Sequence, residues 1–190
     1  MMEHSKYLIM TVTVIIVALL NFLTGVVANF LHIPFFLDTW ATSLGTMTAG
    51  PIIGGLGGIV HNLIMAGTVW GWSAWVWMFS SIWIAFITWY FFKKGYLDIS
   101  KPGKVLQAGL LIGLTNAIVT FLIAMIFFEG LPTYEGTRAT FDAFLAATGS
   151  VPAASLLHHL VSELGDKTVS IFIAAIVFSV IPKKYCLSGK

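Results

Sequence analysis

The sequence predicts an all-α integral membrane protein, folded as a bundle of six transmembrane helices. Three observations support this: 58% of the 190 residues are hydrophobic, only 9% are charged, and the mean hydropathy is +0.92. A soluble domain is about a quarter charged, so a water-soluble globule is excluded. About 20 apolar residues cross a bilayer, which leaves room for about five or six spans. Residues 1–190 therefore form one membrane-embedded domain, with no space for a large soluble catalytic or ATP-hydrolysing domain.

Each predicted helix begins or ends at a recognisable residue. The first stops before Pro34, because the residue before a proline is displaced from helical geometry. Asp38 is suited to cap the second helix, and Pro51 is a favourable first residue for the third. The second and third are short and rich in glycine, so we expect them to pack closely across a tight turn. The expected helices cover, in order, residues 7–31, 38–49, 51–65, 73–92, 105–128, 137–147 and 151–181.

The placement of positive charge predicts the orientation. With six spans, both termini lie on the same side of the membrane as the loop after the fourth span. Eight of the ten basic residues fall there: Lys6, Lys93, Lys94, Lys101, Lys104, Lys183, Lys184 and Lys190. Cytoplasmic segments carry an excess of Lys and Arg, so both termini are predicted to be cytoplasmic. The expected location is the plasma membrane of a bacterial-type cell.

Polar side chains within the apolar segments predict a binding site. Each is costly in lipid unless it is partnered or hydrated. Under the predicted topology these groups converge on the outer half of the bundle, together with a run of tryptophans. The tryptophans suit either the walls of a flat ligand site or an interfacial belt. The predicted substrate-binding residues are Asp38, Asn62, Trp70, Trp72, Trp75, His158, His159 and Glu163.

The last predicted helix carries most of the ionisable groups. His159 and Glu163 are four residues apart and could share a divalent ion, but spacing fixes no third ligand. We therefore expect them to line a ligand cavity, with no metal or other cofactor. Asp166 and Lys167 are adjacent on a helix and are not expected to face each other, so each should pair with another helix.

Other function classes lack their motifs. The sequence has no GxSxG elbow and no phosphate-binding loop, so an enzyme is not expected. A single cysteine, Cys186, excludes a disulfide framework. The net charge of +2 gives no support to nucleic-acid binding.

Two groups of motifs carry a resemblance to a known family. The first half contains Pro34-Phe35-Phe36-Leu37-Asp38-Thr39, Leu44-Gly45-Thr46, Ala49-Gly50-Pro51, Gly54-Gly55-Leu56-Gly57-Gly58 and His61-Asn62-Leu63. The last helix contains Gly165-Asp166-Lys167-Thr168-Val169-Ser170 and ends at Ile181-Pro182. Over nearly the whole chain, these motifs resemble the S-components of energy-coupling factor (ECF) vitamin transporters.

The resemblance implies a substrate-capture subunit that takes up a water-soluble vitamin or related small heterocycle from outside. It implies separate partners, a transmembrane coupling protein and two cytosolic ATPases, and a bundle that topples within the membrane lipid to release its cargo. It also implies that small residues of the first helix dock on the coupling protein, often as an Ala-x-x-x-Ala face. This chain departs from that pattern and offers, at helical spacing, Ala18, Asn21, Gly25, Ala28 and Asn29.

Two other functions stay open. The main alternative is a membrane sensor module that binds a small ligand for signalling, since a related glycine-rich pattern occurs in sensor modules of histidine kinases. A sensor is expected to continue into an effector domain, whereas this sequence stops at Lys190, which favours transport. The third is an intramembrane enzyme that uses His158, His159 and Glu163. For a transported ligand, a thiamine- or pyridoxine-like compound is expected over a polyanion, because the outer side offers few positive charges.

Overall fold

The computed structural model describes residues 2–33 and 35–187, with the backbone alone for residues 2–6. Helices are the regular secondary structure of this part of the chain. Pro34 and Lys190, and the side chain of Lys6, which entered the predictions above, lie outside what is described. The seven α-helices of the described residues are α1 (Met2–Phe30), α2 (Trp40–Ala49), α3 (Pro51–Met65), α4 (Met78–Lys93), α5 (Pro102–Phe127), α6 (Arg138–Thr148) and α7 (Val151–Val180). The shorter turns are η1 (Ala66–Trp70), η2 (Trp72–Trp77), η3 (Glu135–Thr137) and η4 (Lys183–Tyr185).

The predicted helices are confirmed in order and approximate extent, and one capping prediction is wrong. α3 begins at Pro51 and ends at Met65, as expected, and α7 is a single unbroken helix of 30 residues. Asp38 does not cap α2, which begins after Thr39 without a side-chain cap. The carboxylate of Asp38 instead faces the ring of His61, 3.4 Å away.

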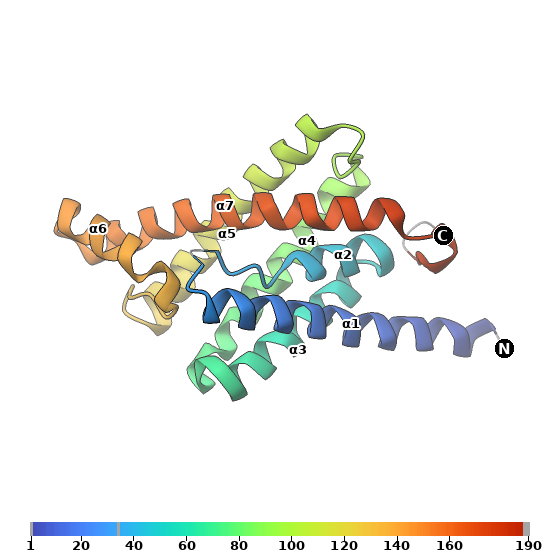
Figure 1. The fold of residues 1–190 in the computed structure, drawn as a ribbon, viewed down its shortest axis with the longest axis horizontal. Coiled ribbons are helices and arrows are strands. Elements are labelled where there is room, and N and C mark those ends of the chain that lie inside the picture. Colours follow the sequence, from blue (N-terminus) through green and yellow to red (C-terminus); the bar gives the residue numbers. More distant parts are fainter. Residues whose placement is uncertain (1, 34, 188–190) are drawn as a thin grey trace.

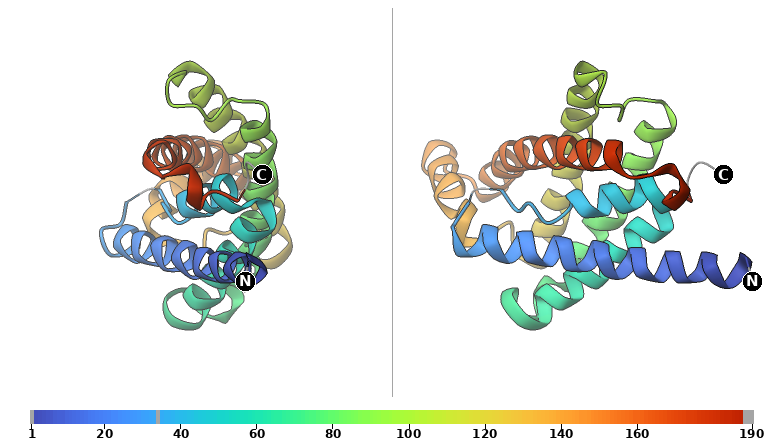
Figure 2. Two further views of the ribbon diagram at one scale, coloured as in Figure 1. Left: turned by 90° about the vertical axis from the view of Figure 1, so that its right-hand side faces the viewer. Right: turned by 45° about the vertical axis from the view of Figure 1, so that its right-hand side comes forward.

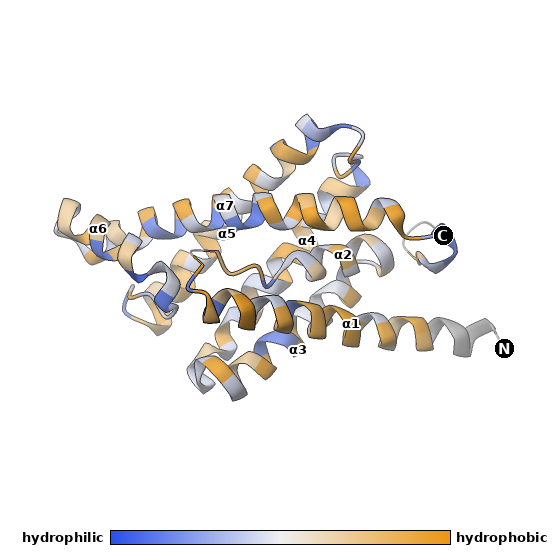
Figure 3. Ribbon diagram, viewed as in Figure 1, coloured by the Kyte–Doolittle hydropathy of each residue, from blue (hydrophilic) through white to orange (hydrophobic). Residues whose placement is uncertain are grey.

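Four segments of the described chain are long and apolar enough to cross a membrane: Tyr7–Phe30, Pro51–Trp70, Trp72–Lys93 and Pro102–Phe127. The chain is therefore a multi-pass helical membrane protein. α2 has only 10 residues, about 15 Å of helix, which is half the thickness of a bilayer core. α7 is long enough to span, but its apolar sequence is interrupted near the middle by the ionisable residues Glu163, Asp166 and Lys167. Figure 3 shows hydrophilic colour in this part of the helix.

The helices form two sets, one along the length of the molecule and one steeply inclined to it (Figure 1). α1 and α7 run along the length of the molecule with α2 between them, while α4 and α5 cross behind them at a steep angle (Figure 1). α1 begins and α7 ends at the same end of the molecule, and α6 lies at the opposite end (Figure 2). α7 packs on α2, α5 and α6, so it is the element to which much of the bundle is attached.

Glycine allows two helix pairs to approach closely. On α5, a β-carbon at Gly113 would lie 2.7 Å from the carbonyl oxygen of Glu163 on α7. On α3, a β-carbon at Gly54 would lie 2.6 Å from the carbonyl oxygen of Thr42 on α2. Small residues permit such close packing of helices in membranes. The expected tight packing of the two glycine-rich helices is therefore confirmed.

α7 divides into an apolar half and a polar half. Its C-terminal half contributes to a hydrophobic core shared with α2, α4 and α5, whose buried members are Leu44, Met47, Phe91, Leu97, Val105, Ala108, Ile112, Ile171, Ala174 and Ala175. Its N-terminal half buries polar and charged side chains instead. The core therefore fixes one end of α7 and presents the other to a polar cavity.

Candidate ligand-binding pocket

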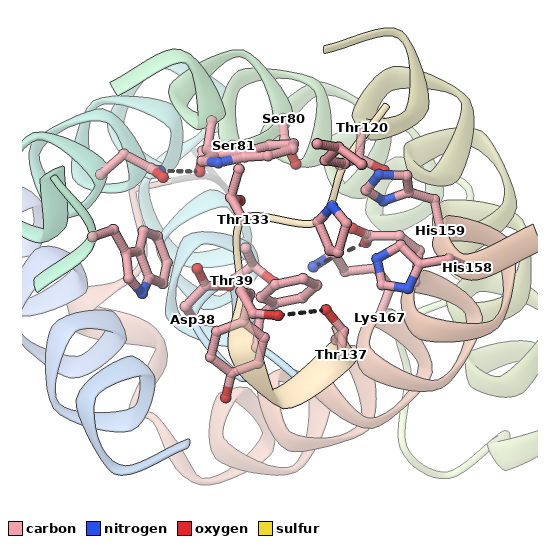
Figure 4. Close-up of a pocket in the computed structure, with 18 residues that line it drawn as sticks. Asp38, Thr39, Ser80, Ser81, Thr120, Thr133, Thr137, His158, His159 and Lys167 are labelled. Carbon is pink, nitrogen blue, oxygen red and sulfur yellow. Dashed lines mark hydrogen bonds and ion pairs between the residues drawn. The ribbon is translucent and has the colours of Figure 1, made fainter. Parts of the chain in front are cut away.

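A pocket lies between the polar half of α7, the helices α3 to α5 and the two segments that connect α1 to α2 and α5 to α6 (Figure 4). Its cavity volume is about 50 Å³, within an empty space of about 620 Å³ that includes the open mouth. The aromatic part of its wall is formed by Phe36, Trp70, Trp77 and Tyr134. Aromatic side chains of this kind suit contact with a flat ring.

The structure brings most of the predicted substrate-binding residues together. Those that line the pocket are Asp38, Asn62, Trp70, His158, His159 and Glu163. Trp72 and Trp75 are not among the lining residues and are 70% and 38% exposed. Trp77 lines the pocket in their place, with its ring stacked on Phe128 at a centroid separation of 5.6 Å.

Lining residues that the sequence prediction missed come largely from loops and from α4. Trp77 precedes Ser80 by three residues, so both project from one face of the helical segment into the pocket. This spacing from Ser80 favours Trp77 as a lining residue over the neighbouring tryptophans Trp72 and Trp75. Phe36, Thr133 and Tyr134 lie in connecting segments, where no helical periodicity identifies a buried side chain.

A network of buried charged and polar groups connects three helices beside the pocket. Nζ of Lys167 lies 3.2 Å from Oε2 of Glu163. The same carboxylate oxygen accepts a hydrogen bond of 2.7 Å from Nδ2 of Asn116 on α5, and Oδ1 of Asn116 accepts one of 3.0 Å from Oγ of Ser80 on α4. The network therefore fixes the position of Glu163 from two sides.

Lys167 also pairs with Asp166, its neighbour in sequence. The expectation that these two side chains do not face each other is wrong. The lysine side chain is long and flexible enough for its ammonium to reach carboxylates before it on the same helix. The expectation that each would pair with another helix is also wrong. Lys167 pairs with two carboxylates of α7 itself. Oδ1 of Asp166 accepts a hydrogen bond of 2.8 Å from the backbone N–H of Leu37, which lies in the segment between α1 and α2.

The backbone next to Asp38 is held in an unusual conformation. Leu37 has φ 49°, in the left-handed region that bulky residues rarely adopt. Its N–H is bound by Asp166 of α7, and its carbonyl accepts a hydrogen bond of 2.5 Å from Oγ1 of Thr24 on α1. Two helices therefore hold Leu37 and direct Asp38 into the pocket.

Polar atoms on the pocket wall lack partners. Among the described residues, four buried atoms that belong to lining residues have no hydrogen-bond partner: Oγ1 of Thr39, Nε1 of Trp70, and Nδ1 of His158 and of His159. Figure 4 shows Asp38 and Thr39 on one side of the pocket, with His158, His159 and Lys167 on the other. Buried polar atoms are nearly always hydrogen-bonded in proteins. The residues that line the pocket therefore include hydrogen-bonding groups that no other described atom satisfies.

The same part of the chain shows no arrangement for a metal ion. The described residues contain no group of three or more His, Cys, Asp or Glu side chains that could hold one. His158 and His159 lie against each other, with ring centroids 4.7 Å apart, and His159 lies near Trp77. Both rings line the pocket.

The segment between α5 and α6 covers the pocket and is attached to the end of α1. The hydroxyl of Tyr134 lies 2.8 Å from the carbonyl oxygen of Ala28 and 3.0 Å from that of Ile33, both of which accept from it. Its ring packs against Phe36 at 5.1 Å. Burial, together with the negative charges of Asp38 and Asp166, raises the pKa of the Tyr134 phenol to about 12, so it stays a donor at physiological pH.

The predicted docking residues of α1 face the interior. Ala18, Asn21, Gly25 and Ala28 are all buried within the chain, and Asn21 bonds both to Oγ1 of Thr42 and to the N–H of Ala41 on α2. They pack α1 against α2 and α3, and they are therefore not free to dock on another protein. Small residues at helical spacing favour close packing of any two helices, so the pattern does not distinguish an internal partner from an external one.

No protein-family model matches the chain, and neither a curated protein nor a solved structure is found to match it.

Proposed function

We propose that this protein is the substrate-capture subunit of an ECF-type importer, which binds a water-soluble vitamin or related small heterocycle from outside the cell. The observation that carries the proposal is the set of four unpartnered buried polar atoms on the wall of one pocket. Each such atom costs free energy unless a ligand or water satisfies it. A heterocycle with polar edges would satisfy several of them at once while its faces contact the aromatic wall.

The motifs that resemble S-components meet at this pocket. The motif Pro34–Thr39 supplies Phe36, Asp38 and Thr39 to the lining, and the motif His61-Asn62-Leu63 supplies Asn62. The motif of the last helix supplies Lys167. Residues that are far apart in sequence and share a family pattern thus contribute to one site. This convergence supports the family assignment that the sequence suggests.

The topology proposed for the subunit has six spans with both termini in the cytoplasm of a bacterial-type cell. The common end of α1 and α7 agrees with termini on one side of the membrane (Figure 1). A transmembrane coupling protein and two cytosolic ATPases would power transport. Because the small residues of α1 are buried, docking would use the outward apolar face of α1, which includes Ile15, Leu19 and Leu23.

Titration of the detergent-purified protein tests the proposal. A panel of water-soluble vitamins and their precursors is added while tryptophan fluorescence and calorimetric heat are recorded. We expect saturable, tight binding of one compound and loss of its affinity in His159→Ala. Binding accompanied by uptake, in cells that also contain an ECF coupling protein and its ATPases, separates a transporter from a sensor module.

Three results would contradict the proposal. Silence across the panel in protein shown to be folded excludes a vitamin-capture site. Binding without uptake supports the sensor module. Chemical conversion of the bound compound that is lost in His159→Ala, with affinity retained, supports an intramembrane enzyme.

A further inference from the structure

The charged groups beside the pocket do not balance. Three carboxylates, Asp38, Glu163 and Asp166, are 7%, 2% and 0% exposed, and Lys167, at 3%, is the one ammonium among them. Of the described residues that line the pocket, Lys167 is the one lysine or arginine. If all four groups are ionised, the cluster has an excess of two negative charges. Buried charges are costly unless they are paired, so an excess of carboxylates favours either a positive partner or protonation of a carboxylate.

His158 and His159 do not supply that charge. A protonated imidazole donates hydrogen bonds from both ring nitrogens. In the described structure Nδ1 of His158 and of His159 is buried without a hydrogen-bond partner. Charging either ring would leave a cationic N–H unsatisfied in the interior. Nε2 of the third histidine, His61, lies 3.4 Å from Oδ2 of Asp38.

Lys167 is already committed to the other two carboxylates. Its ammonium pairs with Asp166 and lies 3.2 Å from Glu163. It also lies 5.8 Å from the centre of the Phe36 ring, where a cation is attracted to the aromatic face. Among the described residues, the ion-pair contact of Asp38 is with His61. Of the carboxylates that line the pocket, Asp38 is therefore the one without a lysine or arginine at ion-pair distance.

We infer that the ligand is a flat heterocyclic cation, whose positive charge lies against Asp38 and Glu163 and whose ring lies between the aromatic side chains of the wall. This inference rests on the proposed function, because it specifies the cargo of the same pocket. Aromatic faces attract organic cations, so Trp70, Trp77 and Tyr134 favour the same charge as the carboxylates. A carboxylated or phosphorylated vitamin would add a negative charge to a site that already has an excess.

Matched pairs of compounds test the sign of the charge on the unmodified protein. The two members of each pair are closely related in structure and differ in charge at neutral pH: thiamine with its neutral, tricyclic oxidation product thiochrome, pyridoxamine with pyridoxine, and 1-methylnicotinamide with nicotinamide. Affinities are measured by calorimetry on protein in lipid nanodiscs. We expect the compound that binds best to be a cation, and its neutral counterpart to bind at least about tenfold more weakly.

Charge-neutral variants locate the effect. Asp38→Asn and Glu163→Gln keep the size and the polarity of each side chain, and each should reduce the preference for the cation over its neutral counterpart about tenfold or more. Asp142→Asn, on the exposed surface of α6, is the control and should leave the preference unchanged. Thermal unfolding of each variant shows whether it is folded, and the comparison of paired compounds on the native protein is independent of any variant.

The outcomes separate this inference from the proposed function. Tight binding of a neutral or anionic compound, with weaker binding of its cationic counterpart, contradicts the inference that the ligand is a cation. It leaves the proposal of a substrate-capture subunit unaffected. A cation preference that survives in both Asp38→Asn and Glu163→Gln also overturns it. Absence of binding by every compound in the panel and in these pairs overturns the proposed function, and the inference with it.

Discussion

The ammonium of Lys167 lies 3.2 Å from the carboxylate of Glu163, one turn earlier on α7, and both side chains are 3% exposed. The pair is therefore an element of the interior and not a surface ion pair. Lys167 also pairs with Asp166, and Glu163 also accepts a hydrogen bond from Asn116, so the pair connects these two groups. Removing one member exposes the others as unpaired charges in a medium that solvates them poorly.

Lys167→Met should be strongly destabilising. Methionine keeps much of the side-chain length but leaves Glu163 and Asp166 without their cation, a change that costs about 3–5 kcal/mol in buried pairs. The thermal midpoint of purified protein in detergent measures the loss. The double variant Lys167→Met with Glu163→Gln removes one of the stranded charges and should recover part of it. A Lys167→Met protein as stable as the unmodified one would show that the cluster is hydrated.

Gly113→Ala should weaken the packing of α5 on α7. The new β-carbon would lie 2.7 Å from the carbonyl oxygen of Glu163 and 2.9 Å from Cα of Leu164. Both neighbours are backbone atoms that cannot rotate away, and overpacking of this kind costs about 1–3 kcal/mol. Gly103→Ala is the matched control on the same helix, because nothing lies within 4 Å of its β-carbon. That variant should be as stable as the parent, or more stable by about 0.5–1 kcal/mol.

Tyr134→Phe should make the stability less sensitive to alkaline pH. The pKa of this phenol is raised from 10.0 to about 12 in the folded protein. A raised pKa means that the contribution of the phenol is complete below pH 10 and is lost as the pH rises through 12. The unmodified protein should therefore lose more of its thermal midpoint over this interval than Tyr134→Phe does. Identical slopes for the two proteins would contradict the burial of the phenol beside Asp38 and Asp166.

Ligand-dependent fluorescence should come from Trp70 and Trp77. Both line the pocket, whereas Trp72 is 70% exposed and lies outside the lining. The fluorescence change on addition of a bound compound should be reduced in Trp70→Phe and in Trp77→Phe and kept in Trp72→Phe. A signal that disappears in Trp72→Phe alone would place the ligand elsewhere on the protein.

Helix positions could be predicted because they depend on local chemistry. Pro51 starts α3, and the glycines of α2 and α3 indicate close packing, both through properties of single residues. The polar members of the pocket could be predicted in the same way. A residue such as Glu163 within an apolar helix requires an internal environment wherever the helix is placed.

The facing direction of small and aromatic residues could not be predicted. Asn21 and Ala28 have the spacing of a docking face, but that spacing only requires a close neighbour, which is α2 or α3 of the same chain. Trp72, Trp75 and Trp77 differ in position around a short turn of helix, and the irregular geometry of η2 decides which one faces inward. Asp38 resembled a cap because its partner, His61, is distant in sequence.

The conformation of Leu37 has a consequence for how the pocket opens. A left-handed backbone at a non-glycine residue costs about 1–3 kcal/mol and persists only where its surroundings enforce it. Here the enforcement consists of two hydrogen bonds, one to Asp166 and one from Thr24. If either bond breaks, Leu37 relaxes and regains part of that cost, which offsets part of the free energy of breaking the bond. The segment that carries Asp38 therefore needs less free energy to move than its two hydrogen bonds alone would require.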